Sequence, residues 1–296
     1  MVRREVILKS IVLIAILVVA TTAVQADYDW RYVDGKDYMT PVQNQEDGLT
    51  CWAFAAIGAL EAKFDIGTNN PNLNLNLSEQ HLVCDDDYTH FYGGINYYLG
   101  DATTTGGYEF AACAYFTDNG VTNEETIPYN QQDTSPFYPP TPTYTLYGVS
   151  AYQNWLDCST SNLKNYLQNE GPLVTFMDAA ADWYTPIVSP AGADSWDFGL
   201  PEYYASKPPA WHAVVLAGFV DNEDVAGDGY WIVKNSWGTD WGDSGYGYMT
   251  YATTEFRDRT HALTGDLWTA VVPLPGAVLL GILGLGVVGI KLRRYA

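Results

Sequence analysis

The stretch PVQNQEDGLTCWAFA, residues 41–55, decides how the rest of the chain is interpreted. From Cys51 to Phe64 the chain is rich in alanine and its apolar residues recur at helical spacing, which predicts a buried helix. Cys51 is expected at the first position of that helix, where the positive end of the helix dipole favours a thiolate. Because the thiolate is the nucleophilic form of cysteine, the stretch predicts a core helix that begins with a reactive thiol.

Two later segments supply side chains that can work with a nucleophilic cysteine. The first, WHAVV at residues 211–215, places His212 at the start of an apolar strand, where it can act as a general base. The second, KNSWG at residues 234–238, supplies Asn235, whose amide can orient an imidazole. Taken singly, each residue also fits a structural role, as a core thiol, a structural histidine or part of a turn. Taken together they indicate a thiol-dependent hydrolase.

The composition excludes several classes of protein. With 47% hydrophobic and 17% charged residues, the 296-residue chain is expected to fold rather than remain disordered. Its net charge of −21 makes nucleic acid an unsuitable partner, and six of its 14 basic residues lie near the two ends. The four cysteines show no CxxC spacing, and the acidic stretches at 85–87 and 221–228 do not match a calcium-binding loop. We therefore expect no metal ion and no organic cofactor.

Helical patterns precede strand patterns along the chain, which indicates an α+β protein of two lobes. Ser78 is the expected N-cap of the second helix. Residues 135–147, with four prolines, are the expected crossover between the lobes, and the family resemblance described below implies that the stretch 85–105 is longer than usual and reshapes one side of the cleft. The predicted helices span 51–64, 77–83 and 110–116, and the predicted strands span 173–177, 213–220, 230–234 and 246–251.

The N-terminal segment has the pattern of a secretory signal peptide. Arg3, Arg4 and Lys9 form a basic region, residues 11–20 are an unbroken apolar run, and Ala26 ends a small-residue exit. We expect cleavage after Ala26, with an uncleaved membrane anchor as the alternative. Export places the protein in a compartment where disulfide bonds are permitted.

The C-terminal segment has the pattern of a second membrane signal. VPLP at residues 272–275 precedes an uncharged stretch that ends at Ile290 and is followed by a basic cluster at 291–294. Counted from Val271, the uncharged stretch is long enough to cross a bilayer as a helix, with the basic cluster in the cytoplasm. These three parts resemble the tripartite PEP-CTERM sorting signal of Gram-negative bacteria, although Leu274 stands where that signal commonly has an acidic residue.

That resemblance implies processing by an exosortase-type enzyme and delivery to the cell surface or the extracellular space. Before processing, the C-terminal helix would engage the inner membrane, and a plain tail anchor is the alternative. The expected organisation is a signal peptide at 1–26, one two-lobed domain at 27–270 and a sorting signal with a transmembrane helix at 271–296.

The motifs between the two ends resemble those of the papain-like cysteine peptidases. They cover most of the body and occur in the order of that family. The resemblance implies a two-lobed fold, with a helical lobe that bears Cys51, a β-barrel-like lobe that bears His212 and Asn235, and a cleft between them. Besides the segments of those residues, the matching motifs are DWR at 29–31, LSEQ at 77–80, Gly106-Gly107, Pro128-Tyr129 and Gly171-Pro172.

The resemblance also implies the roles of the catalytic residues. Cys51 is expected to be the nucleophile, and His212 its general base and later acid. Asn235 is expected to fix the orientation of the imidazole. Gln45, six residues before Cys51, is expected to complete an oxyanion hole with the Cys51 N–H.

Three further residues are expected to bind substrate or shield the site. Trp237 would exclude water from the His–Asn hydrogen bond, and the backbone of Gly106 and Gly107 would bind an extended peptide. The resemblance therefore implies an exported cysteine endopeptidase that acts on peptide or protein substrates. A non-catalytic peptide-binding module on the same fold and a transpeptidase are the alternatives.

The chain departs from that family at its cysteines. Gly48 and Thr104 stand where the family has a disulfide pair. The resemblance suggests a Cys84–Cys158 disulfide as a hypothesis, and Cys113 is expected to be a buried free thiol on the apolar face of a helix. Only two residues separate the expected cleavage site from the DWR motif, so no inhibitory propeptide is expected between them.

Overall fold

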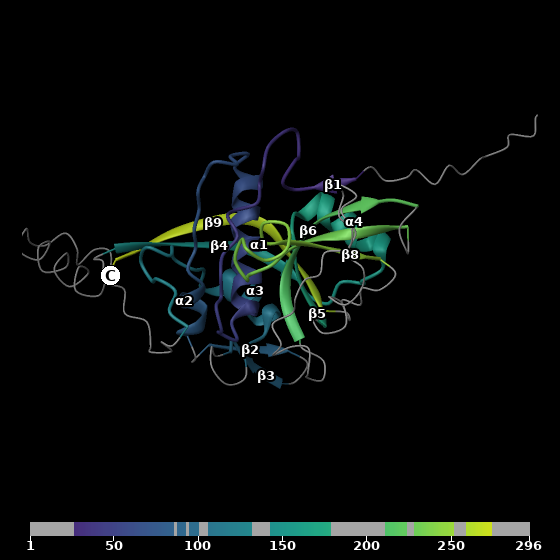
Figure 1. Ribbon diagram of the computed structural model, residues 1–296. Coiled ribbons are helices and arrows are strands. Elements are labelled where there is room, and N and C mark those ends of the chain that lie inside the picture. Colours follow the sequence, from purple (N-terminus) through teal and green to yellow (C-terminus); the bar gives the residue numbers. More distant parts are fainter. Residues whose placement is uncertain are drawn as a thin grey trace, which may run out of the picture.

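A long central helix packed against an antiparallel sheet organises the computed structural model (Figure 1). The structure describes residues 27–85, 88–92, 95–100, 106–131, 143–178, 211–223, 228–251 and 259–273. The helices in these ranges are α1 (Cys51–Gly67), α2 (Glu79–Val83), α3 (Glu109–Asp118) and α4 (Thr160–Glu170). The strands are β1 (Tyr28–Asp29), β2 (Thr89–Tyr92), β3 (Ile95–Tyr98), β4 (Thr143–Gln153), β5 (Leu173–Asp178), β6 (Trp211–Asp221), β7 (Gly229–Lys234), β8 (Tyr246–Thr250) and β9 (Thr260–Pro273).

Helix α1 lies in the core because nearly all of its side chains are apolar or small. Most of its residues are buried around the whole circumference, as expected for a helix without a polar face. Small residues bring it close to the sheet: a Cβ added at Gly58 would lie 3.3 Å from Val215 Cγ2 of β6. The predicted helix at 51–64 is confirmed, and α1 continues to Gly67.

The four predicted strands are confirmed as β5, β6, β7 and β8. They are consecutive antiparallel neighbours in a seven-stranded sheet of order β4-β9-β5-β6-β7-β8, in which β1 pairs with β6. Strand β6 is buried from His212 to Phe219, so its apolar run is continuous rather than alternating. This central position holds His212 at the end of a strand that is fixed by neighbours on both edges.

The longest strand pair differs from the expectation. Strands β4 and β9 pair from Thr143↔Pro273 to Gln153↔Ala262. Residues 143–147, which were expected to end the crossover, are therefore the first residues of β4. The rest of that crossover lies outside the described residues. Strand β9 continues to Pro273, three residues beyond the boundary expected after residue 270.

The helical side of the molecule follows the sequence closely. Ser78 caps α2 as predicted, because its Oγ accepts a hydrogen bond from the His81 N–H at 3.1 Å. The helix predicted at 110–116 is confirmed as α3, and Cys113 on this helix is a fully buried thiol. Helix α4 was not predicted, because its sequence is mostly polar and only Leu163 and Leu167 give it an apolar stripe.

The hypothesis of a Cys84–Cys158 disulfide is wrong, since both residues are thiols. Cys84 ends α2, where its Sγ accepts a hydrogen bond from Gln80 Nε2 at 3.2 Å. Cys158 precedes α4 in the other lobe, and its Sγ lies 3.4 Å from Leu156 O and 3.4 Å from Thr260 Oγ1. Each sulfur is held by neighbours in its own lobe.

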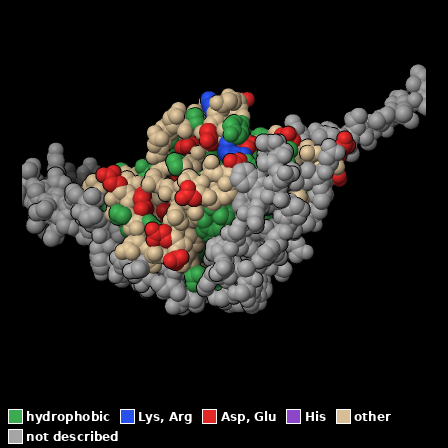
Figure 2. Space-filling model, viewed as in Figure 1, with side chains coloured by type: hydrophobic (Ala, Val, Ile, Leu, Met, Phe, Trp, Pro, Cys, Tyr) green, Lys and Arg blue, Asp and Glu red, His purple; other side chains and the backbone are tan. Residues whose placement is uncertain are grey.

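Part of the long stretch at 85–105 forms a two-stranded hairpin of β2 and β3. The Tyr97 ring of this hairpin packs edge to face on Tyr108 and Phe110, with centroids 5.2 Å and 4.9 Å away. The visible face in Figure 2 carries many acidic and few basic side chains among the described residues. No helix in the described ranges is long and apolar enough to span a membrane. The expected signal peptide at 1–26 and residues 274–296 of the expected tail lie outside those ranges.

Candidate active site

Residues of the helical side and of the sheet line one cleft of about 480 Å³. This cleft brings together five of the seven site residues expected from the sequence, namely Gln45, Cys51, Gly106, Gly107 and His212. The other two, Asn235 and Trp237, contact His212 directly. Leu49, Trp52, Gly100, Tyr108, Phe176, Trp211 and Arg259 complete the lining.

Cys51 is the first residue of α1 and is partly exposed in the cleft. Burial raises the pKa of its thiol to about 11, and the nearby Glu109 carboxylate also raises it. The backbone N–H groups of Ala213, Trp52 and Cys51 itself act in the opposite direction. The helix N-terminus therefore favours the thiolate as expected, but burial outweighs it for Cys51 taken alone. A stable thiolate at this position needs a cation beside it.

His212 is buried at the start of β6, and its ring orientation is fixed by Asn235. His212 Nε2 lies 2.7 Å from Asn235 Oδ1, and the Ser236 N–H donates to the same Asn235 oxygen at 2.7 Å. Because a backbone N–H can only donate, Asn235 Oδ1 must be the acceptor in both hydrogen bonds. His212 Nε2 must therefore carry the proton of the neutral imidazole. The neutral imidazole therefore keeps its Nδ1 lone pair available to accept a proton.

Burial lowers the pKa of His212 to about 4, whereas the hydrogen bond to Asn235 raises it. An isolated imidazolium is thus disfavoured at neutral pH, as an isolated Cys51 thiolate is. Trp237 covers the imidazole, with ring centroids 4.6 Å apart and an interplanar angle of 30°. The indole lies where it was expected, over the ring that forms the His–Asn hydrogen bond.

Gln45 is a buried side chain held by both of its polar atoms. Its Oε1 accepts a hydrogen bond from Ser236 Oγ at 2.6 Å, and its Nε2 donates to Gly48 O at 2.6 Å. The Gln45 N–H also donates to Ser236 O at 2.8 Å. Since an amide nitrogen has two hydrogens, Nε2 keeps one donor for a ligand in the cleft that it lines. Ser236 thus links Asn235, which orients His212, to Gln45.

Gly106 and Gly107 form part of the cleft wall because no larger residue fits there. Gly106 has a φ of +68°, in the left-handed region that favours glycine. A Cβ added at Gly107 would lie 2.3 Å from Leu99 O and 2.4 Å from the Trp52 ring. The backbone of this pair can therefore come close to a ligand, as expected for a segment that binds an extended peptide.

Tyr129 is a site-supporting residue whose role the sequence did not reveal. Its hydroxyl donates to Gln45 O at 2.9 Å and lies 2.7 Å from Thr50 Oγ1, the residue before Cys51. A Cβ added at Gly48 would lie 2.6 Å from the same hydroxyl. Gly48 is the position where the resembling family has a cysteine, so here a tyrosine hydroxyl ties the loop that carries Gln45 to the start of α1.

Replacing Tyr129 with phenylalanine is expected to lower the free energy of unfolding by about 1 kcal/mol, because two oxygens lose a hydrogen-bond partner. Chemical denaturation measures this difference. Tyr88→Phe is the control, since its hydroxyl contacts Asp118 at an exposed position and its removal should change stability by less. Equal losses of unfolding free energy in the two variants would contradict a stabilising role for the Tyr129 hydroxyl.

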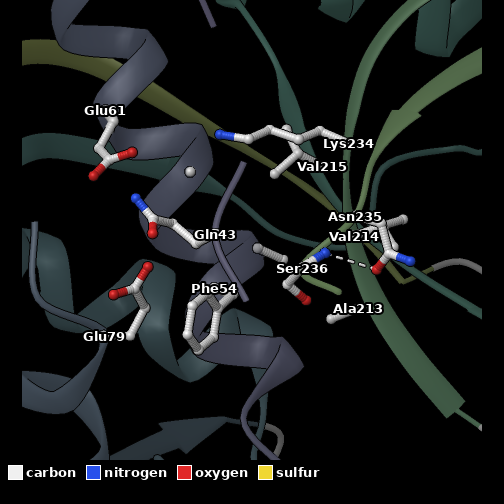
Figure 3. A pocket seen from close by; sticks show the side chains of 12 residues that line it. Gln43, Phe54, Glu61, Glu79, Ala213, Val214, Val215, Lys234, Asn235 and Ser236 are labelled. Carbon is white, nitrogen blue, oxygen red and sulfur yellow. Dashed lines mark hydrogen bonds between the residues drawn. The ribbon is translucent and has the colours of Figure 1, made fainter. Parts of the chain in front are cut away.

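Behind the cleft, a cluster of charged side chains surrounds a very small cavity between α1 and β7 (Figure 3). Lys234 extends from β7 toward α1 and donates to Thr40 Oγ1 at 3.0 Å, and Thr40 donates to Glu61 Oε2 at 2.5 Å. Burial raises the pKa of Glu61 and raises the pKa of Glu79 well above its usual value. Burial lowers the pKa of Lys234, while Glu61 and Glu79 raise it.

Among the described residues, no group of three or more His, Cys, Asp or Glu side chains is arranged to hold a metal ion. The arrangement of the cleft is instead that of a thiol, an oriented imidazole and an amide donor. These groups can perform nucleophilic acyl transfer without a cofactor.

Known proteins match this chain in sequence and in fold. The family described as papain family cysteine protease matches residues 24–262. A cysteine protease of Blomia tropicalis is 30% identical over 224 residues, and procathepsin L of Felis catus is 32% identical over 234 residues. Each alignment covers 75% of this chain and 60% of the relative. The chain therefore spans less than two thirds of the length of these curated relatives.

Solved structures match the fold over more than four fifths of the chain. A structure from work on the mite allergens Blo t 1 and Der p 1 matches with a TM-score of 0.59 and 25% identity, covering 84% of this chain and 73% of the other. Bromelain of Ananas comosus matches with a TM-score of 0.55 and 24% identity, covering 82% of this chain and all of the other. The expected α+β fold with two lobes is confirmed.

Proposed function

Because the chain belongs to the papain family of cysteine proteases, we propose that it is an exported endopeptidase that hydrolyses peptide bonds through an acyl-enzyme on Cys51. The observation that carries this proposal is the tautomer of His212. The Ser236 N–H and His212 Nε2 share Asn235 Oδ1, which leaves His212 Nδ1 as a base on the side of the ring away from Asn235.

The Cys51 thiol and the His212 imidazole act as a pair. Burial opposes each charge when it is formed alone, since it raises the pKa of Cys51 and lowers the pKa of His212. Transfer of the thiol proton to His212 Nδ1 creates both charges together, and each stabilises the other. The thiolate–imidazolium state is therefore a property of the pair, and Trp237 limits the access of water that would weaken the attraction.

In the first half of the reaction, Cys51 Sγ attacks the peptide carbonyl carbon, and the carbonyl electron pair moves onto oxygen. The Cys51 N–H and the remaining Gln45 Nε2 hydrogen stabilise this oxyanion. When the C–N bond breaks, the imidazolium of His212 gives its proton to the leaving amine and a thioester forms. Water then attacks the thioester, His212 takes its proton, and the acid product leaves as the Cys51 thiol is restored.

Labelling with an epoxide inhibitor of cysteine peptidases tests the proposal. We expect one equivalent to be incorporated at Cys51, to remove all peptidase activity, and to react far faster than at Cys158, a thiol of similar exposure. Cleavage within long peptides from a mixed library supports endopeptidase action. Equal labelling of the two thiols would leave the non-catalytic peptide-binding module as the better description, and product transfer to an added amine would identify a transpeptidase.

The proposal of export rests on the two ends of the sequence. The basic and apolar pattern of residues 1–26 supports secretion, and the pattern from Val272 to Arg294 supports recognition by an exosortase-type enzyme at the inner membrane. Expression of the full chain in a Gram-negative host with such an enzyme, followed by fractionation and mass mapping of both termini, tests it. A chain recovered in the cytoplasm with both ends intact would overturn it.

A further inference from the structure

One permanent cation lines the cleft that holds Cys51 and His212. Arg259 precedes β9, and its side chain is 28% exposed. Among the described lining residues, no other lysine or arginine and no aspartate or glutamate contributes to this cleft. The walls around Arg259 are aromatic, since Tyr108, Phe176 and Trp211 belong to the same lining.

The guanidinium of Arg259 lies against the Phe176 ring. Its Cζ lies 4.7 Å from the centroid of the Phe176 ring, and Phe176 stacks on Trp211 with centroids 5.7 Å apart and an interplanar angle of 27°. Trp211 precedes His212 in β6. An aromatic ring attracts a guanidinium through a cation–π interaction that uses none of the N–H donors, so these donors remain able to bind a ligand. The cation therefore contacts β5, the strand that pairs with the His212-bearing strand β6.

Glu109 anchors Arg259 from behind without using its hydrogen-bond donors. The Glu109 side chain is fully buried, and its Oε1 lies 3.9 Å from Arg259 Nε, which is an ion pair but too long for a hydrogen bond. The same oxygen lies 3.2 Å from His261 Nε2. Within the described ranges, Glu109 is the sole carboxylate paired with Arg259. Because Glu109 is inaccessible from the cleft, a ligand meets the guanidinium and not the carboxylate.

We propose that Arg259 is a specificity-determining residue that binds the carboxylate of a glutamate or aspartate side chain in the peptide substrate. This inference rests on the proposed peptidase function and names its substrate class. The cleft that Arg259 lines also includes Gly106 and Gly107, so the acidic side chain belongs to the peptide segment that lies along this glycine pair. Its aliphatic part packs against Phe176 and Tyr108, and its carboxylate meets the guanidinium edge in a charge-assisted pair.

Because the protein as a whole is negatively charged, the preference for an acidic side chain depends on the short-range contact with Arg259 and not on long-range attraction. A net charge of −21 repels acidic peptides at long range, and that repulsion is screened by salt. A carboxylate that reaches the guanidinium in the partly enclosed cleft forms hydrogen bonds that salt screens much less. The preference for an acidic side chain should therefore become clearer as ionic strength rises.

The test compares cleavage of fluorogenic peptides that differ at one position by Glu, Gln or Lys, with each position before the scissile bond scanned in turn. At one position, kcat/KM for the Glu peptide is expected to exceed that for the Gln peptide by on the order of 10–100-fold. Arg259→Gln should lower kcat/KM for the Glu peptide by a similar factor and leave the Gln peptide nearly unchanged. Arg259→Lys should restore part of the preference.

Lys63→Gln is the matched control, because it removes the same charge at a remote ion pair with Glu170 and should not change the preference. Epoxide titration of Cys51 gives the concentration of active enzyme for every variant, so a failure of the proposed function shows as absence of titratable sites. Active wild-type enzyme that cleaves Glu and Gln peptides equally at every position, or that prefers Lys, would overturn the inference even if Arg259→Gln fails to fold.

Discussion

Replacing Cys51 with alanine is expected to lower kcat for peptide hydrolysis on the order of 10⁵-fold without unfolding the protein. The loss is large because no acyl-enzyme can form, and the remaining His212 and Gln45 groups have no nucleophile to assist. Stability should change little, since Cys51 is only half-buried at the first position of α1 and alanine is a good helix former. Active-site titration, steady-state kinetics and thermal unfolding measure the three quantities.

Cys158→Ala is the control for this result. Cys158 has similar exposure to Cys51 but lies before α4, with its Sγ beside Leu156 O and Thr260 Oγ1. Its removal should leave kcat unchanged. A Cys51→Ala protein that is folded and retains more than about a hundredth of the wild-type kcat would show that peptide hydrolysis does not use this thiol.

Replacing Lys234 with methionine is expected to lower the free energy of unfolding by about 3 kcal/mol at pH 8 and by much less at pH 5. Lys234 is buried, and Glu61 and Glu79 face it from the helical lobe. Without the cation, neither buried carboxylate has Lys234 as a compensating positive charge, and each must remain ionised at a cost or bind a proton.

The sign of the pH effect follows from the raised pKa of these acids. Burial already raises the pKa of Glu61 and of Glu79, and loss of Lys234 raises both further. Between the unfolded and folded pKa values, the folded variant binds protons that the unfolded chain has released, so its stability rises as pH falls. The penalty is therefore complete at high pH and is lost as pH falls through the folded pKa values.

The quantity to measure is the difference in unfolding free energy between variant and wild type at each pH. This difference removes the contribution of His81, whose pKa burial alone lowers to about 4. Asp65, whose pKa burial raises to about 7, also interacts with Lys234, so loss of the cation raises its pKa further and adds to the effect with the same sign. Lys63→Met is the matched control, because its ion pair with Glu170 is partly exposed and should contribute less than about 1 kcal/mol at both pH values. If the loss of unfolding free energy in Lys234→Met is the same at pH 5 and pH 8, Lys234 does not stabilise the ionised forms of Glu61 and Glu79.

The elements that could be predicted are those whose pattern is local. Helix α1 and strands β5 to β8 consist of continuous apolar runs bounded by turn residues, so their type and approximate bounds follow from the residues themselves. Strands β4 and β9 are different. Their residues are mostly half-exposed or exposed, β4 contains an irregularity between Val149 and Ala151, and each strand is defined by its pairing with a segment more than a hundred residues away.

The residues of the candidate site also fall into two groups, those that a short motif identifies and those whose role depends on a contact made by folding. Cys51, His212, Asn235 and Gln45 belong to short motifs, and the resemblance of those motifs to a known family was enough to select them. Tyr129 belongs to a motif that the sequence also offered, but its supporting role was missed, because its hydroxyl acts on Gln45, 84 residues earlier, and no local pattern predicts that contact.

Arg259 was missed for a related reason. Its role depends on Phe176 and Glu109, which come from a strand and a helix far apart in sequence. Residues that act through a partner brought near by folding carry no signal in their own neighbourhood.

The pair of strands β4 and β9 separates the cleft from the last residue of the described chain, Pro273. Strand β9 begins beside Arg259 in the cleft and runs 14 residues to Pro273, a length on the order of 45 Å at about 3.3 Å per residue. Pro273 therefore lies at the opposite end of β9 from Arg259 (Figure 1). Any attachment made through the residues after Pro273 would therefore be separated from Cys51 and His212 by the length of this strand pair.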